Sequence, residues 1–168
     1  MEDARRIGEY IKKQKVIKDL NAQGLHFESS DFSGRNFYGC SFSEASFTDC
    51  DFSAVYMRLV FFDFSQFTFC DFSNVDFRFV VFAGADIKDC KFEGAELVDL
   101  NYGGAVISDT IFNNNNLYNS RFIESRISRS KFINCNLKRS NFYRCIQEET
   151  TFKSSNTAEA IFEMEETV

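Results

Sequence analysis

The sequence contains no proline, no tryptophan, a single histidine and no long run of apolar residues. Proline cannot donate a backbone hydrogen bond, so its absence is typical of a backbone in which nearly every amide is needed. One histidine, His26, offers little for general acid–base or metal chemistry, which needs a second convergent group, and a capping or surface role is expected for it. Without an apolar stretch of about 20 residues, no membrane-spanning helix is expected.

The chain is acidic, with a formal net charge of −6 and a sequence pI near 4.9. Proteins that bind nucleic acids gain affinity by neutralising phosphates with Lys and Arg, so we expect no direct nucleic-acid partner. The first twenty residues carry six basic side chains and lack the apolar run of a signal peptide. We therefore expect one domain in the cytoplasm, without membrane association.

Phenylalanine is abundant, and most of it recurs at intervals of five. Eighteen of the 22 Phe share one register between Phe27 and Phe162. A period of five fits neither a helix nor a flat strand, so each repeat is predicted to be a short extended segment followed by a bend. From 27 to 142 all twenty-four positions of the register are apolar, and those without Phe hold Met57, Ile87, Leu97, Tyr102, Ile107, Leu117, Ile127 and Leu137.

A small residue stands two positions before most of these large ones. A spacing of two in extended backbone puts both side chains on one side, so each repeat contributes one large and one small inward residue. The nearest cysteines are ten residues apart, which excludes a Cys-x-x-Cys site, and we expect free thiols with no metal and no cofactor. A disulfide between two cysteines that stack on neighbouring turns of the chain is the alternative. All six occupy the small position: Cys40, Cys50, Cys70, Cys90, Cys135 and Cys145.

Runs such as Cys50-Asp51-Phe52-Ser53-Ala54 and Cys70-Asp71-Phe72-Ser73-Asn74 match the small, polar, large, polar, polar pattern of the pentapeptide-repeat proteins. Over roughly residues 25–146 the chain resembles that family. The resemblance implies an all-β solenoid, a right-handed quadrilateral β-helix in which four pentapeptides form one coil of twenty residues. We expect about six to seven such coils within residues 25–156.

The N-terminal end of a solenoid needs a cap. Ile7, Tyr10, Ile11, Ile17 and Leu20 fall close to helical spacing, while the lysines of this segment lie elsewhere. This pattern predicts an amphipathic α-helix over residues 3–20, laid on the first coil within an N-terminal cap of residues 1–24. A helix that binds a membrane surface or a partner is the alternative.

The C-terminal segment, residues 157–168, is acidic and keeps few apolar residues, among them Ile161, Phe162 and Met164. We expect these to form a C-terminal cap or, as in several members of the family that the chain resembles, the contact of a homodimer.

Four Phe lie outside the register, at outward positions, with three other apolar residues nearby. Folding the chain onto square coils places Leu59 beneath Phe79 and Phe61 beneath Val81 on two faces that share a corner, which predicts a contiguous exposed apolar patch. Such patches usually mark partner sites, although the terminal segments or a dimer mate could cover this one. The predicted patch consists of Tyr56, Leu59, Phe61, Phe64, Phe69, Phe79 and Val81.

Charged residues also recur at multiples of twenty. Asp31, Asp51 and Asp71 are predicted to stack in one acidic column, serving either turn hydrogen bonds or function. A second column is predicted to hold Asp49, Asp89 and Asp109. Residues 115–145 carry seven basic side chains against one Glu, and Arg121, Arg126, Lys131, Lys138 and Arg139 of this basic band are expected to lack acidic partners.

Two functions follow from these features. The first is a non-enzymatic scaffold that presents a rigid rod to a protein partner. The second rests on resemblance to the Qnr-type quinolone-resistance proteins, which resemble a DNA duplex in width and charge and bind type II topoisomerases such as gyrase. The basic band and the unbroken register depart from that group.

Overall fold

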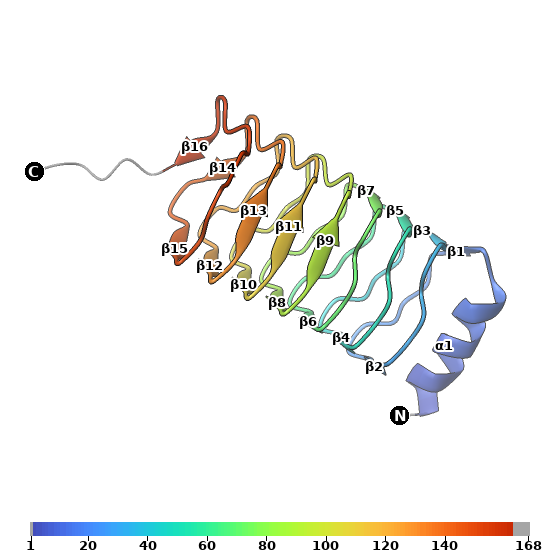
Figure 1. The fold of residues 1–168 in the computed structure, drawn as a ribbon. Helices are drawn as coiled ribbons and strands as arrows, with labels where there is room; N and C mark the ends of the chain where they lie inside the picture. Colours follow the sequence, from blue (N-terminus) through green and yellow to red (C-terminus); the bar gives the residue numbers. More distant parts are fainter. Residues whose placement is uncertain (1, 163–168) are drawn as a thin grey trace, which may run out of the picture.

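The computed structural model describes residues 2–162 as an elongated parallel β-solenoid with one helix, α1 (Glu2–Lys13), across its N-terminal end (Figure 1). Its strands are mostly of three residues. One sheet holds β1 (Val16–Lys18), β3 (Asn36–Tyr38), β5 (Tyr56–Arg58) and β7 (Asp76–Arg78). The longest, seven-stranded sheet holds β2 (His26–Glu28), β4 (Ser46–Thr48), β6 (Gln66–Thr68), β8 (Asp86–Lys88), β10 (Val106–Ser108), β12 (Arg126–Ser128) and β15 (Ile146–Glu148).

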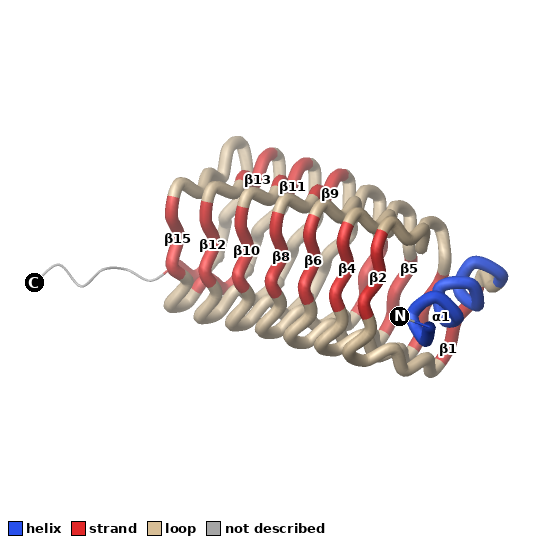
Figure 2. The backbone as a smooth tube through the Cα atoms, turned by 90° about the horizontal axis from the view of Figure 1, so that it is seen from below, coloured by secondary structure: helices blue, strands red, loops and turns tan. Residues whose placement is uncertain are grey.

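The other two faces of the solenoid carry shorter sheets and isolated bridges. A three-stranded sheet holds β9 (Lys91–Glu93), β11 (Ile111–Asn113) and β13 (Lys131–Ile133), and a pair holds β14 (Asn141–Phe142) and β16 (Ile161–Phe162). Figure 2 shows the seven-stranded face as a ladder of parallel rungs, with α1 lying at one end.

Every paired strand is offset from its neighbour by twenty residues. Ile17 pairs with Phe37, and Phe47 pairs with Phe67, always in parallel. The isolated bridges keep the same offset, as between Asp31 and Asp51. Four pentapeptides therefore make one coil, and the structure has about seven coils. The predicted quadrilateral β-helix with an N-terminal helix is confirmed.

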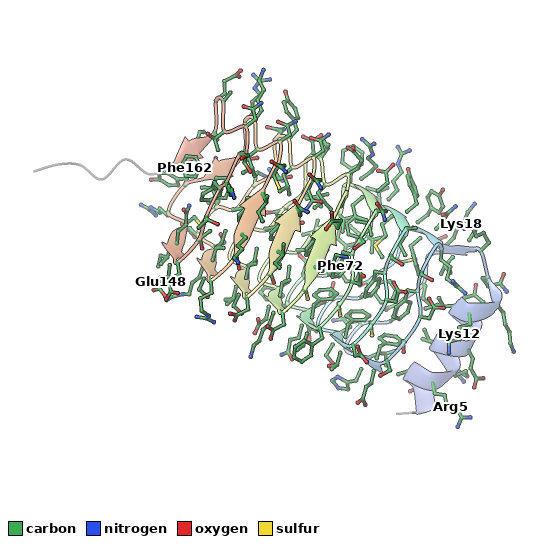
Figure 3. The ribbon with its side chains drawn as sticks, in the orientation of Figure 1. Arg5, Lys12, Lys18, Phe72, Glu148 and Phe162 are labelled. Carbon is green, nitrogen blue, oxygen red and sulfur yellow. The ribbon has the colours of Figure 1, made fainter. Side chains whose placement is uncertain are left out.

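The large inward residues form columns of stacked rings along the axis. Phe72, labelled in Figure 3, is one of these residues. It lies between Phe52 and Phe92, with ring centroids 4.9 and 4.6 Å apart and planes within 7° of parallel. The ring spacing equals the spacing of hydrogen-bonded strands, so the backbone ladder imposes the stacking. Each such aromatic pair adds about 0.5–1.5 kcal/mol to the gain from burial.

The small inward Ser and Cys residues donate hydrogen bonds to backbone carbonyls. Ser65 Oγ donates to Phe42 O over 2.7 Å, and the Cys50 thiol makes the same type of contact with Phe27 O. All six cysteines are free thiols, as expected. Burial raises the pKa of the Cys40 and Cys135 thiols, which keeps these groups neutral.

One inward polar residue is larger than the rest. Asn115 donates from its side-chain amide to Phe92 O over 3.0 Å and accepts from Ala95 N over 2.8 Å. The Asn115 side chain thus pairs with backbone groups of the neighbouring coil. Because both ends of its amide have partners, Asn115 can be buried in the apolar core.

The N-terminal helix is shorter than predicted. It ends at Lys13, where the Arg35 guanidinium donates to the carbonyls of Ile11 and Lys12 and so satisfies the last turn. Ile17 lies in β1 and is fully buried at a large inward position. The predicted end of the helix at residue 20 and the repeat boundary at residue 25 are therefore wrong, because the first coil already begins near Val16.

The helix packs its apolar side on the first coil. Ile11 is fully buried, and Ala4 and Ile7 pack against the same core. Tyr10, which we expected on that face, is 46% exposed. No helix among the described residues has the length and apolar character that crossing a membrane requires.

At the other end, residues 157–162 continue the coil. β16 pairs with β14, and the Phe162 ring stacks on Phe142 with centroids 4.8 Å apart. These residues extend the repeat instead of starting a separate cap at 157. Ile161 and Phe162 are 50% and 37% exposed, so no described residue covers this end. Met164 lies outside the described residues, and the homodimer stays a prediction.

We expect Phe72→Ala to lower the free energy of unfolding by roughly 3–5 kcal/mol, because it opens a cavity between two stacked rings. Urea denaturation followed by circular dichroism measures this loss. A loss below about 1 kcal/mol would contradict the inward position of Phe72.

Tyr102 occupies a fully buried ring position, and its hydroxyl has no hydrogen-bond partner among the described residues. We expect Tyr102→Phe to raise the free energy of unfolding by about 1–2 kcal/mol, because it removes a buried unsatisfied polar group. The matched change Phe122→Tyr, one coil further in the same column, should lower it. Urea denaturation of both variants is the measurement, and a loss of stability in Tyr102→Phe would contradict the account.

Candidate protein-interaction surface

Every fifth residue of the solenoid has a left-handed backbone conformation. These residues stand two positions after each large inward residue, and their φ values lie between +45° and +69°. Glycine adopts this conformation freely, and Asn and Asp tolerate it better than other residues do. Most turns here obey that preference or hold another polar residue, as at Gly24, Asp49 and Asn74.

Four consecutive or nearly consecutive turns break the preference with large apolar residues. Leu59, Phe64, Phe69 and Phe79 have φ values of 54–57°. Their side chains are 51%, 67%, 60% and 56% exposed. A non-glycine residue in this region costs about 1–3 kcal/mol, and exposing a large apolar side chain gives no burial in return. These positions therefore combine a strained backbone with an exposed apolar side chain, which favours a role in binding a partner.

Two of these turns lie at one corner of the solenoid. Leu59 directly follows β5 and Phe79 directly follows β7, one coil further. Beyond the corner, Phe61 and Val81 are bridged neighbours on the adjacent face, with Phe61 43% exposed. The predicted stacking of these four residues is confirmed.

Phe64 closes the far side of that face. Its ring lies over Gly84, where an added Cβ would be 2.5 Å from two ring carbons. Glycine at 84 therefore provides the space that the ring occupies. Leu59, Phe61, Phe64, Phe79 and Val81 together form a surface that we call the apolar face.

The other two residues of the predicted patch do not belong to the apolar face. Phe69 follows β6 and lies at the corner diagonally opposite Leu59, one face beyond Phe64, so we do not include it in the apolar face. The coil geometry separates the two corners by two faces. Tyr56 is half-buried on β5, with its ring centroid 5.6 Å from that of Tyr38.

A shallow pocket of about 320 Å³ adjoins the apolar face at Phe79. Sequence reasoning missed it, although the arginines twenty residues apart were a visible signal. Arg78 Nε donates to Asp76 over 2.8 Å across its rim. The pocket is lined by Tyr56, Arg58, Arg78, Phe79, Val98 and Asp99.

The first predicted acidic column exists, and its carboxylates serve turns. Asp31, Asp51 and Asp71 are bridged in sequence, and Lys91 continues the column. Each Asp accepts from the backbone N–H two residues on, over 2.7–2.8 Å. The hydrogen bonds from Ser33 also lower the pKa of Asp31. These contacts support the structural interpretation of the column.

The second predicted column is interrupted. Phe69 stands between Asp49 and Asp89, since the three residues share one corner at intervals of twenty. Asp109 makes a bidentate pair with Arg129, both distances being 2.7 Å, and this pair lowers the pKa of Asp109. No continuous acidic strip results among the described residues.

The basic band is more neutralised than predicted. Lys138 and Arg139 both pair with Glu159, at 3.2 and 3.1 Å. Arg121, Arg126 and Lys131 lie on three successive faces of one coil, so they form no single basic patch.

His26 Nδ1 lies 2.6 Å from Ser46 Oγ at the surface. Residues 2–162 contain no cluster of three His, Cys, Asp or Glu that could hold a metal ion.

Comparison with known families covers most of the chain. A family model described as pentapeptide repeats (8 copies) matches residues 26–63 and 62–97, and one described as a pentapeptide repeat region matches residues 85–162. The chain belongs to the pentapeptide-repeat family. No curated protein matches the sequence.

Solved pentapeptide-repeat structures resemble this one. Full-length QnrB1, a plasmid-mediated fluoroquinolone resistance protein, matches with a TM-score of 0.61 and 16% identity over 88% of this chain and 91% of QnrB1. HetL of Nostoc sp. strain PCC 7120, involved in heterocyst differentiation regulation, matches with a TM-score of 0.39 and 12% identity over 94% and 95% of the two chains. At such identities the likeness to QnrB1 shows the shared fold alone.

We expect Leu59→Asn, Phe69→Asn and Phe79→Asn each to leave the stability of this pentapeptide-repeat protein unchanged or to raise it by up to about 1 kcal/mol, because Asn tolerates the left-handed turn better. The reverse change at an equivalent turn, Asn134→Phe, should destabilise. Urea denaturation of the four variants tests this. A loss above about 1 kcal/mol in the Asn variants would show that the exposed side chains stabilise the fold instead.

Proposed function

We propose that this pentapeptide-repeat protein is a non-enzymatic scaffold that binds a protein partner through the apolar face. The observation that carries the proposal is the coincidence of exposure and left-handed backbone at Leu59, Phe64 and Phe79. A free monomer gains nothing from exposing these large apolar side chains, whereas a partner that buries the three side chains recovers the hydrophobic contribution, about 25 cal/mol per Å².

The solenoid suits such a role mechanically. Parallel ladders and stacked rings hold Leu59 and Phe79 one coil apart. Both residues lie in tight turns directly after a strand, so no long loop has to become ordered when a partner binds. A preorganised surface loses little conformational entropy when it binds, so more of the contact energy appears as affinity. Aromatic side chains at the centre of a surface patch are also the residues that dominate protein interfaces.

The identity of the partner as a type II topoisomerase is a second, narrower proposal. It is favoured by the charge of residues 21–114, which hold fourteen acidic and five basic side chains. Against it stand the carboxylates of Asp31, Asp51 and Asp71, which are turned to their own backbone, and the cation of Lys91 in the same column. A DNA mimic would need those charges to face the enzyme.

We expect Phe61→Asp combined with Phe79→Asp to abolish capture of the partner from a lysate of the source organism while leaving circular dichroism unchanged. Mass spectrometry of the proteins bound to wild type identifies the partner. A topoisomerase subunit among them would support the narrower proposal.

Phe69→Asp is the matched control, since it places the same charge on an exposed turn at the opposite corner. It should leave capture intact. Equal capture by wild type and the Phe61/Phe79 double variant would exclude the apolar face as the binding site.

A further inference from the structure

The apolar face has cations along one edge. Arg58 immediately precedes Leu59, Arg78 immediately precedes Phe79, and the two arginines are paired neighbours in β5 and β7. The backbones of the two arginines are thus one strand spacing apart, at about 4.8 Å, beside the exposed corner formed by Leu59 and Phe79. Like charges at this separation repel unless an anion lies between or beside them.

The carboxylates of the protein itself pair with only one of these two arginines. Arg78 is paired with Asp76, and the pair is partly exposed. Asp99, at the far side of the pocket, accepts from Asn119 Nδ2 over 2.6 Å. Arg58 is exposed and makes no ion pair or side-chain hydrogen bond with any residue between 2 and 162. The pocket therefore has one cation free to bind an external carboxylate.

We propose that the apolar face binds an acidic peptide segment, in which an aspartate or glutamate stands next to an apolar anchor residue. This inference rests on the proposed function and specifies its partner. The carboxylate binds Arg58, with Arg78 beside it, and the apolar side chain fills the pocket between Tyr56, Phe79 and Val98. The rest of the segment continues across Leu59 and Phe61.

Charge complementarity selects this occupant over a nucleic acid. A phosphate backbone would place many charges along the rod, where Asp76, Glu96 and Asp99 lie near the two arginines. A single carboxylate flanked by apolar atoms matches one free guanidinium flanked by aromatic rings. Charge-assisted hydrogen bonds from Arg to a carboxylate are also strong and geometrically specific.

The test begins with selection of twelve-residue peptides from a random phage-displayed library on the purified full chain, with the Phe79→Asn variant as the counter-selection. Peptides that survive should carry Asp or Glu adjacent to an aromatic or aliphatic residue. The consensus peptide, labelled with fluorescein, is then titrated by fluorescence anisotropy.

Arg58→Gln should raise the Kd of this peptide roughly tenfold, since it removes a charged hydrogen bond at an exposed site. The matched control Arg126→Gln, at an exposed arginine on another face, should leave the Kd unchanged. Replacing the peptide carboxylate with an amide should weaken binding to wild type as much as Arg58→Gln does, and should have little further effect on that variant.

Several outcomes would overturn the inference: no enrichment of peptides, enrichment of peptides without carboxylates, or equal affinity of wild type and Arg58→Gln. Self-association of the chain that Phe79→Asn abolishes in sedimentation velocity would assign the face to a second copy instead. If Arg58→Gln retains the cellular partner while the Phe61/Phe79 double variant loses it, the scaffold proposal stands and only the acidic partner is wrong.

Discussion

The parallel hydrogen-bond ladder between coils is the constraint on which the rest of the structure depends. Its offset of twenty residues brings every inward residue over its equivalent one coil below, as Phe72 over Phe52. The strand spacing then equals a good stacking distance for phenyl rings, so backbone hydrogen bonding and side-chain packing reinforce each other. Proline would remove a donor from the ladder, which accounts for its absence from the chain.

Because of the same constraint, only the outward residues are available to contact other molecules. Two of every five side chains are committed to the core, and one of the remaining three has a left-handed backbone. At Gly84 and Asn74 that turn is filled by residues that suit it. At Leu59 and Phe79 the turn holds large apolar residues, which adopt a left-handed backbone at a cost in folding free energy. This cost favours a role for the two side chains in binding a partner.

Electrostatics along the rod is mostly local. Acidic and basic residues twenty apart meet as pairs, such as Asp109 with Arg129 and Glu124 with Arg144. Single Asp residues bend back to the amide two positions on, as Asp51 does toward Ser53. Arg58 makes no ion pair with any residue between 2 and 162, and it directly precedes Leu59 at the exposed corner of the apolar face.

The amino-acid sequence by itself determined the repeat and the inward residues, because a strict period of five leaves one register in which 18 of the 22 Phe face inward. The twenty-residue coil was what the resemblance to the pentapeptide-repeat proteins implied. Folded on that coil, the sequence also placed Leu59 beneath Phe79. Only the tertiary structure decided where the helix ends, because Ile17 fits both a helical and a pentapeptide pattern and Arg35, distant in sequence, caps Lys12. Tertiary structure likewise showed the left-handed strain at the turns, since the backbone dihedrals follow from how the coils close in space.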